Sequence, residues 1–259
     1  MTDQTERLAR IIVQSKRIIV FTGAGVSTES GIPDFRSPGG IWSKYDPEDF
    51  TIQKFVSSPA ARRAFWTMSA EGALLAQAEP NRAHYAIAEL HALCKLDCVI
   101  TQNVDNLHQK SGVPDNMVLE LHGNMRRVVC LSCRNRFPLP DMLSEVGGET
   151  QVPDCPDCQG TLKPDAVLFG EQLPVVTLRE ATRRAQQCDL LIVIGSTLMV
   201  YPAAYMPTYA ASAGATLAIV NLTETPLDHE AEVVIRGRAG EIMPGVMNCV
   251  RRLQSSESS

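Results

Sequence analysis

Six short runs of apolar, largely β-branched residues recur along this chain, and they limit the possible folds more than any other feature. They occupy residues 17–21, 97–101, 118–121, 190–194, 216–220 and 233–235. Continuous apolar runs of this length are typical of strands buried on both faces of a parallel sheet. The intervening segments show helical spacing, with expected helices that bury Leu8 and Val250 and one that begins after a cap at Asn81. Strands that alternate with helices predict an α/β fold with a doubly wound parallel sheet.

Polar and glycine residues follow five of these runs at the point where each run ends. The five ends read Thr22-Gly23-Ala24-Gly25, Thr101-Gln102-Asn103-Val104-Asp105, His122-Gly123, Gly195-Ser196-Thr197 and Asn221-Leu222-Thr223. In open α/β sheets, ligands bind in the crevice outside the carboxyl ends of the strands. One such end alone would be an ordinary turn, but five together predict a shared ligand site.

The first of these ends is a glycine-rich turn between a strand and a helix. Glycines at Gly23 and Gly25 would let backbone N–H groups approach a pyrophosphate at a helix N-terminus. The next glycine is Gly31, which is too distant for the dehydrogenase fingerprint, and no acidic residue ends a second strand about 20 residues further on. The turn therefore predicts a bound dinucleotide without hydride transfer.

Four of the eight cysteines form two Cys-x-x-Cys pairs. Cys130 pairs with Cys133 and Cys155 with Cys158, and 21 residues separate the two pairs. Four thiolates with this spacing are typical of a tetrahedral zinc site, although a redox dithiol is the alternative. Because the protein supplies all four ligands, no position remains for water, and we expect one structural Zn²⁺ whose binding helps this segment to fold.

The composition excludes several classes of protein. With 44% hydrophobic residues, the 259-residue chain can bury a sizeable core, and its 24 basic and 29 acidic residues give a net charge of −5. That balance argues against a DNA-coating protein and predicts no specific nucleic-acid partner. No apolar run reaches the ~20 residues needed to span a membrane, and the polar N-terminus lacks a signal sequence. We expect a cytoplasmic protein with no membrane association. Since no dimerisation element is visible, we expect a monomer.

Seven ordered motifs carry a resemblance to a known family. They are Gly23-Ala24-Gly25-Val26-Ser27 with Gly31-Ile32-Pro33-Asp34-Phe35-Arg36, then 101–105, Leu121-His122-Gly123, the four paired cysteines, 163–171, Gly195-Ser196-Thr197-Leu198, and Asn221. From about Arg17 to Pro244 the chain resembles the sirtuins, the NAD-dependent protein lysine deacylases, in their compact prokaryotic form. Where sirtuins often read Gly-Thr-Ser, this chain has Gly195-Ser196-Thr197, and both orders supply hydroxyl groups.

The resemblance implies a reaction in which NAD is a co-substrate. The carbonyl oxygen of the acyl-lysine attacks C1′ of the nicotinamide ribose and expels nicotinamide. His122 then acts as general base on a ribose hydroxyl, which attacks the acyl carbon. The products are nicotinamide, O-acetyl-ADP-ribose and the deacylated lysine. Imidazole suits this role because it titrates near neutrality.

The resemblance also implies three sets of site residues. The catalytic residues are His122 and Asn103. The cofactor-binding residues are Gly23, Ala24, Gly25, Thr28, Ile32, Asp34, Phe35, Arg36, Gln102, Asn103, Asp105, Gly195, Ser196, Thr197, Asn221, Leu222 and Ala239. The acylated protein substrate binds as an extended strand on Val167, Leu168, Phe169, Gly170 and Glu171. Of the other histidines, we interpret His84 as structural and His108 as a support behind the site.

We expect a discontinuous, Rossmann-like NAD-binding domain made of residues 1–36, 81–125 and 166–253. A helical insertion at 37–80 and a zinc-ribbon module at 126–165 interrupt it, and a disordered tail at 254–259 follows it.

Acyl preference is predicted from the segment before Glu79-Pro80-Asn81. Sirtuins that remove acidic acyl groups carry a Tyr-x-x-Arg pair there, whereas this chain places Met68 and Glu71 near those positions. A carboxylate would repel an acidic acyl chain, so we expect acetyl or another uncharged acyl group. One alternative is a mono-ADP-ribosyltransferase that uses the same NAD cleft. Another is a non-catalytic zinc-ribbon binding module, which the net acidity and His122 argue against.

Overall fold

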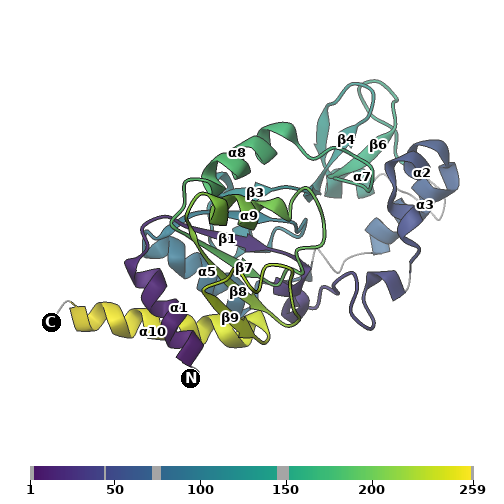
Figure 1. The fold of residues 1–259 in the computed structure, drawn as a ribbon. Coiled ribbons are helices and arrows are strands. Elements are labelled where there is room, and N and C mark those ends of the chain that lie inside the picture. The colour runs from purple at the N-terminus through teal and green to yellow at the C-terminus, as the bar shows by residue number, and fades with distance from the viewer. Residues whose placement is uncertain (1–2, 44, 72–76, 145–151, 258–259) are drawn as a thin grey trace.

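Six parallel strands form the central sheet, and each comes from one of the six apolar runs (Figure 1). The structure is a computed structural model that describes residues 3–43, 45–71, 77–144 and 152–257. The strands are β1 (Ile18–Thr22), β2 (Leu96–Thr101), β3 (Val118–Glu120), β7 (Leu190–Ile194), β8 (Thr216–Asn221) and β9 (Val233–Arg236). The prediction of an α/β fold with a parallel sheet is confirmed.

The strand order places the polar strand ends together. The order is β3-β2-β1-β7-β8-β9, so the chain builds outward from β1 in one direction and then from β7 in the other. The carboxyl ends of the central strands are level, because Thr22 pairs with Thr101 on one side and with Ile194 on the other. The boundary between β1 and β7 is therefore a topological switch point, where α/β proteins bind their ligands.

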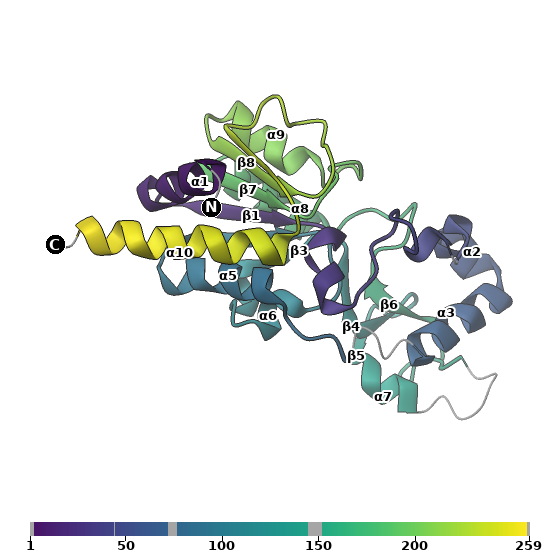
Figure 2. The same cartoon turned by 90° about the horizontal axis from the view of Figure 1, so that it is seen from below.

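Helices cover both faces of the sheet (Figure 2). On one face lie α1 (Asp3–Gln14), α5 (Arg82–Ala92) and α10 (Ala239–Glu257), and on the other lie α8 (Val175–Ala185) and α9 (Tyr205–Ser212). Successive strand residues supply the two cores in alternation: Val20 packs in the first core, and its neighbours Ile19 and Phe21 pack in the second. Both faces are buried, which explains why the strands read as unbroken apolar runs.

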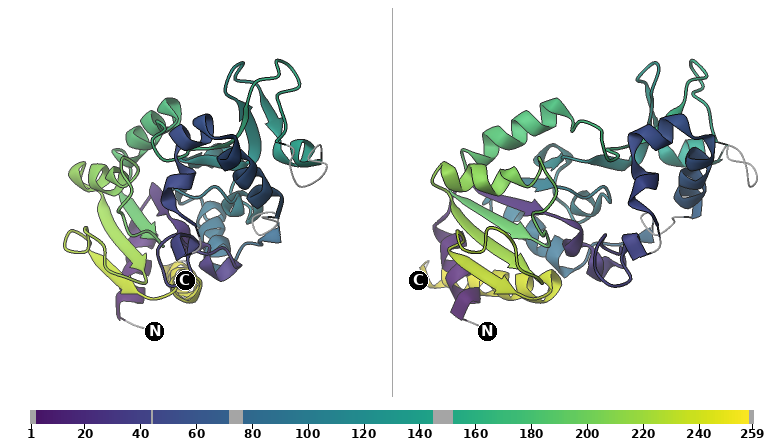
Figure 3. Two further views of the ribbon diagram at one scale, coloured as in Figure 1. Left: turned by 90° about the vertical axis from the view of Figure 1, so that its right-hand side faces the viewer. Right: turned by 45° about the vertical axis from the view of Figure 1, so that its right-hand side comes forward.

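Two further segments lie to one side of the sheet (Figure 3). The first runs from the end of β1 through η1 (Ala24–Val26), η2 (Thr28–Ser30), η3 (Ile41–Ser43), η4 (Pro47–Phe50), α2 (Ile52–Ser57) and α3 (Pro59–Glu71). The second is an antiparallel sheet of β5 (Arg136–Pro138), β4 (Gly123–Cys130) and β6 (Leu162–Ala166) with α7 (Leu139–Ser144). Trp66 of α3 packs against Val128 and Leu162, so the two segments share a small core. Shorter elements, α6 (Leu107–Lys110) and η5 (Asp115–Met117), connect β2 to β3.

The C-terminus differs from the sequence expectation. We expected disorder from residue 254, but α10 continues to Glu257, so the expectation is wrong for residues 254–257. The hydroxyl of Ser255 donates to the Arg251 carbonyl at 2.9 Å, and that of Ser256 donates to the Leu253 carbonyl at 2.7 Å. Both hydroxyl groups thus bond to carbonyls of the preceding turn of the helix.

No helix in the described part of the chain combines the length and apolar character that crossing a membrane requires.

Candidate active site

A cavity of about 410 Å³ opens at the carboxyl ends of the central strands. Its lining contains His122 and fifteen of the seventeen predicted cofactor residues, all except Ile32 and Asp105. The lining residues follow the ends of β1, β2, β3 and β7, and others come from the end of β8 and the start of α10 at Ala239. The structure therefore brings together at one cavity the strand ends that the sequence singled out.

The glycine-rich turn after β1 is joined to the turn after β7. Gly23 N–H donates to the Ile194 carbonyl at 3.3 Å, and Gly25 N–H donates to the Gly195 carbonyl at 2.8 Å. A Cβ atom on Gly25 would lie 2.8 Å from that same carbonyl oxygen, which explains the requirement for glycine. Among the described residues Ala24 N–H has no partner, so Ala24 carries the part of this turn that can donate to an anion.

A buried serine links two of the predicted cofactor-binding residues. Ser27 Oγ donates to Asp105 Oδ2 at 2.7 Å and accepts from Asn103 Nδ2 at 3.1 Å. Asp105 also accepts the Leu107 N–H at 3.0 Å, and its carboxylate lies behind the cavity wall. Asp105 therefore orients Asn103 through Ser27. We did not predict Ser27 as a site residue, although it ends the Gly23–Ser27 motif and its hydroxyl was the available signal.

His122 lies at the cavity with a defined ring orientation. Its Nδ1 is 2.9 Å from the Gln102 carbonyl oxygen. A carbonyl can only accept, so Nδ1 carries the hydrogen, and Nε2 holds the basic lone pair of the neutral ring. Burial lowers the pKa of His122, and the bond to Gln102 only partly opposes this. The imidazole is therefore neutral at pH 7 and able to accept a proton at Nε2.

The loop after the first turn carries an aromatic side chain to the cavity. Phe35 is 40% exposed, and its ring lies 5.1 Å from that of Trp42, which in turn lies 5.8 Å from Phe169. The Asp34 carboxylate accepts the N–H groups of Arg36 and Ser37 at 3.0 and 2.8 Å. Asp34 therefore stabilises the turn of this loop and also lines the cavity. An aspartate can do this because its carboxylate accepts N–H groups two or three residues further along the chain.

The predicted peptide-binding segment lies beside the cavity and outside its lining. Val167 N–H donates to the His122 carbonyl at 2.8 Å, and Leu168 N–H donates to Glu171 Oε2 at 2.7 Å. Phe169 pairs with the segment before α2, through Phe169 N–H to the Phe50 carbonyl at 2.9 Å. The Leu168 and Phe169 carbonyls accept the N–H groups of Glu171 and Ile52, whereas Gly170 N–H has no partner among the described residues.

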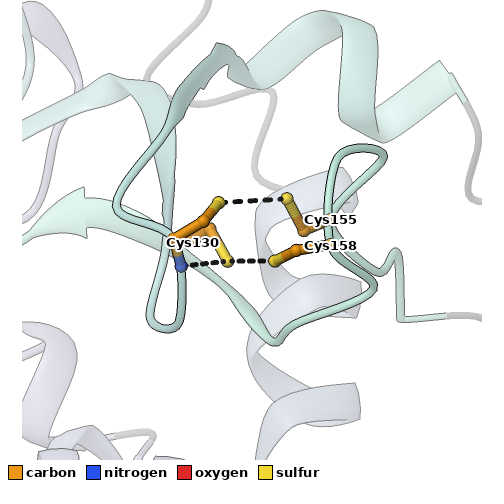
Figure 4. Close-up of side chains that lie close together, drawn as sticks. Cys130, Cys155 and Cys158 are labelled. Atoms are coloured by element: carbon orange, nitrogen blue, oxygen red, sulfur yellow. Dashed lines mark hydrogen bonds between the residues drawn. The ribbon is translucent and has the colours of Figure 1, made fainter.

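The four paired cysteines converge on one point (Figure 4). Their sulfur atoms lie within 4.8 Å of one another, with 3.5 Å between Cys130 and Cys158 and 3.7 Å between Cys133 and Cys155. Tetrahedral zinc with Zn–S bonds of about 2.3 Å requires sulfur separations of about 3.8 Å. Backbone N–H groups of Ser132 and Cys133 also point at the sulfur of Cys130, at 3.4 and 3.5 Å. The residues present fit one zinc ion with no position for water.

Two histidines form a buried pair behind the site. Their rings are 5.1 Å apart, with His84 Nδ1 accepting the Asn81 N–H at 3.2 Å and His108 Nε2 lying 2.9 Å from Thr22 Oγ1. Burial lowers the pKa of His84 to about 4 and that of His108 well below its usual value. Both rings are neutral packing groups at pH 7, as the sequence led us to expect for His84.

Sequence reasoning missed several residues of the cavity lining. They are Glu29, Ser37, Met199, Val200, Val220, Thr223, Gly237 and Arg238. Most of them adjoin a predicted residue in the sequence, so motifs extended by one or two residues would have included them. Glu29 also accepts Gly240 N–H at 2.7 Å and so fastens the start of α10 to the first turn. The side chains of Met68 and Glu71, on which the acyl prediction depends, lie outside the described ones.

The parallel sheet has a cavity at its switch point and a glycine-rich first turn, and the four cysteines lie in a separate module. Together these features define a Rossmann-like nucleotide-binding protein with a structural metal site. Comparison with known proteins refines this class. Residues 23–202 match the model of the family described as "Sir2 family". An "NAD-dependent protein deacylase 2" of Archaeoglobus fulgidus is 45% identical over 99% of this chain and 100% of its own length. An "NAD-dependent protein deacetylase" of Sulfurisphaera tokodaii is 41% identical over 99% of this chain and 100% of its own length.

Solved structures agree with the sequence relatives. A complex described as "Sir2-p53 peptide-NAD+" is 38% identical, with a TM-score of 0.86, and covers 96% of this chain and 98% of its own. A "Structure of Sir2Tm bound to a propionylated peptide" is 37% identical, with a TM-score of 0.84, over 95% and 98% of the two chains. The chain belongs to the Sir2 family, and the resemblance to sirtuins is confirmed.

Proposed function

We propose that this protein is an NAD-dependent protein lysine deacylase that releases nicotinamide, O-acetyl-ADP-ribose and the free lysine. One observation carries the proposal: a neutral His122 lies at the cavity that the predicted NAD residues line, with Nε2 as its basic atom. The relatives named for this activity support it, as does a Sir2 complex with a deacetylated p53 peptide and 3′-O-acetyl ADP ribose.

The residues divide the work in the following way. Ala24 N–H and the turns after β1 and β7 hold the pyrophosphate of NAD, and Asn103, which Ser27 and Asp105 orient, holds the nicotinamide amide. The acyl oxygen of the lysine displaces nicotinamide from C1′. His122 Nε2 accepts the proton of the ribose hydroxyl that then attacks the acyl carbon. A water molecule adds to that carbon as its bond to the lysine nitrogen breaks, which frees the lysine and leaves the acyl group on the ribose.

The zinc ion acts on structure alone in this proposal. Cys130, Cys133, Cys155 and Cys158 would hold it, and four protein ligands leave no open position for a reacting group. The chemistry that zinc supplies is the cross-linking of β4 to the segment before β6.

The substrate is an acylated lysine in an extended peptide that lies against Val167–Glu171. Gly170 N–H and the free carbonyls of this segment would pair with the peptide backbone, which gives affinity with little sequence preference. We propose that uncharged acyl groups are preferred, because Met68 and Glu71 stand near the positions where sirtuins that remove acidic acyl groups carry tyrosine and arginine. The monomeric state and the cytoplasmic location stay predictions, which light scattering and cell fractionation can check.

Incubation with NAD and an acetylated peptide, followed by mass spectrometry, tests the function. Deacylation removes about 42 Da from the peptide and produces O-acetyl-ADP-ribose in equal amount. His122→Ala should abolish the product while leaving the fold intact, and His229→Ala is a matched control because His229 is exposed in a loop. ADP-ribose attached to protein without deacylation would instead identify a mono-ADP-ribosyltransferase.

A further inference from the structure

A buried lysine lies beneath the segment that we assign to the peptide. Lys163 of β6 is 3% exposed. Its Nζ donates to the carbonyls of Pro164 and Ala166 at 2.9 and 2.5 Å, and lies 3.0 Å from Glu171 Oε2. An ammonium group has three donor hydrogens, so all of them have partners here. The same Glu171 oxygen accepts the Leu168 N–H, so one ion pair holds the turn from Ala166 to Glu171 at both ends.

The same turn is joined directly to the proposed general base. The carbonyl of the Ala166–Val167 peptide group accepts from Lys163, and the N–H of that peptide group donates to the His122 carbonyl at 2.8 Å. Gly123, the next residue after His122, pairs with Ala166, and a Cβ atom on Gly123 would lie only 2.0 Å from the Asp165 carbonyl oxygen. A single peptide plane is thus fixed by Lys163 at one end and by the backbone of His122 at the other.

Fold stability alone gives little reason for a charge at this place. Burial lowers the pKa of Lys163, and the Glu171 carboxylate opposes that effect. Well-packed apolar residues can replace a buried ion pair without loss of stability. An apolar pair cannot bond to the Ala166 carbonyl or the Leu168 N–H, and these bonds set the direction of the peptide-binding segment.

We propose that Lys163 is a positioning residue of the deacylation reaction, which sets the peptide-binding segment relative to His122. This inference rests on the function proposed above. If the Ala166–Val167 peptide plane turns, the bound peptide moves with it, and the acyl carbon leaves the reach of the ribose hydroxyl that His122 activates. Misplacement by about 1 Å can lower turnover by up to ~10²-fold.

Four variants separate positioning from packing. Lys163→Met removes the charge, and the double variant K163M/E171L replaces the ion pair by apolar side chains. Lys163→Arg keeps a cation with several donors, and Lys16→Met is the control because Lys16 is exposed beside the start of β1. For each variant, KM for an acetylated peptide, KM for NAD, kcat, Tm and zinc content are measured.

We expect Lys163→Met to lower kcat by up to ~10²-fold and to raise the peptide KM about tenfold or more, while the NAD KM changes by less than about twofold. In K163M/E171L the Tm should lie above that of Lys163→Met, because no unpaired carboxylate is left, while the peptide KM stays high. Lys163→Arg should recover part of the peptide affinity, and Lys16→Met should match the wild type.

Two results would overturn the proposal. A peptide KM near the wild-type value in K163M/E171L would show that the ion pair only fills space. Equal losses for peptide and NAD in Lys163→Met, or lost zinc, would show a general structural role. If the wild type does not deacylate, the proposed function fails instead, and the affinity of the four variants for a fluorescent acetyl-peptide still decides the role of Lys163.

Discussion

Gly25 offers the sharpest test of how the cavity is built, because the same substitution elsewhere in the chain has the opposite expected sign. In Gly25→Ala the new Cβ would lie 2.8 Å from the Gly195 carbonyl oxygen and 2.9 Å from Gly195 Cα. Ordinary contact begins at 3.4 Å, so the two turns must separate by about 0.6 Å (3.4 − 2.8).

That separation has an energetic and a functional result. The bond from Gly25 N–H to the Gly195 carbonyl would lengthen from 2.8 Å to about 3.4 Å, beyond normal geometry. Overpacking costs about 1–3 kcal/mol and the weakened bond about 1 kcal/mol, against a gain of roughly 0.4–1 kcal/mol from the less flexible unfolded chain. We expect a net loss of about 1–3 kcal/mol, and a rise in the NAD KM of about tenfold because both turns line the cavity.

Gly245→Ala is the matched control. Gly245 lies inside α10, and a Cβ atom there would meet only Thr5 Cγ2, at 3.9 Å. Alanine should therefore stabilise the helix by about 0.5–1 kcal/mol and leave the NAD KM unchanged. Urea unfolding of the zinc-loaded proteins and steady-state kinetics measure both effects. The reasoning is refuted if Gly25→Ala keeps wild-type stability and NAD KM, or if both variants lose stability equally.

Three further predictions concern metal, stability and activity. Cys130→Ser should lose the zinc, and its free energy of unfolding should fall by at least about 3 kcal/mol, which lowers Tm by about 10 °C. Cys94→Ser should change neither the zinc content nor the stability. An inactive Cys130→Ser with full zinc content and an unchanged Tm would contradict the metal assignment. Because burial lowers the pKa of His84 to about 4, the unfolded chain binds a proton at His84 that the folded chain does not as the pH falls from about 6.5 toward 4. His84 should contribute a loss of stability of up to about 1.4 kcal/mol per pH unit in that window, in addition to the losses from His108 and His122. Urea unfolding above the pH of zinc release should give a smaller slope for His84→Gln and an unchanged one for His229→Gln. Because the pKa of His122 is lowered, kcat/KM for deacylation should be level near pH 7 and fall only at a pH below about 6.5, and a fall that begins at higher pH would count against His122 as the base.

The fold was largely predictable because its strongest signal is local. Each buried strand, such as Leu190–Ile194, reads as an unbroken apolar run, and Asn81 does cap α5, by accepting the Ala83 N–H at 2.8 Å. Most of the cavity residues were predictable because they directly follow strands, and the carboxyl ends of parallel strands lie at the same edge of the sheet.

What the sequence could not predict depends on contacts between distant segments. Nothing in the motif around Gly25 shows that its N–H bonds to Gly195, which leaves Ala24 as the donor toward an anion. Lys163 reads as a surface residue in a polar motif, and only the fold shows that three oxygens surround it. The polar C-terminus at 254–257 reads as disordered because it lacks the apolar spacing that predicts a helix, although α10 continues through it.

The pairing of Gly123 with Ala166 has a consequence for how such a protein can vary. The chain leaves the central domain just after His122 and returns just before Val167, and the points of exit and return are adjacent partners in β4 and β6. Because the two ends of this inserted segment are adjacent, its length does not change the distance between the two points where it joins the rest of the chain. We therefore expect the segment between β4 and β6 to tolerate changes in length, provided that Lys163 and the contact of Trp66 with Val128 and Leu162 are kept. His122 and the segment after Ala166 would then keep their places.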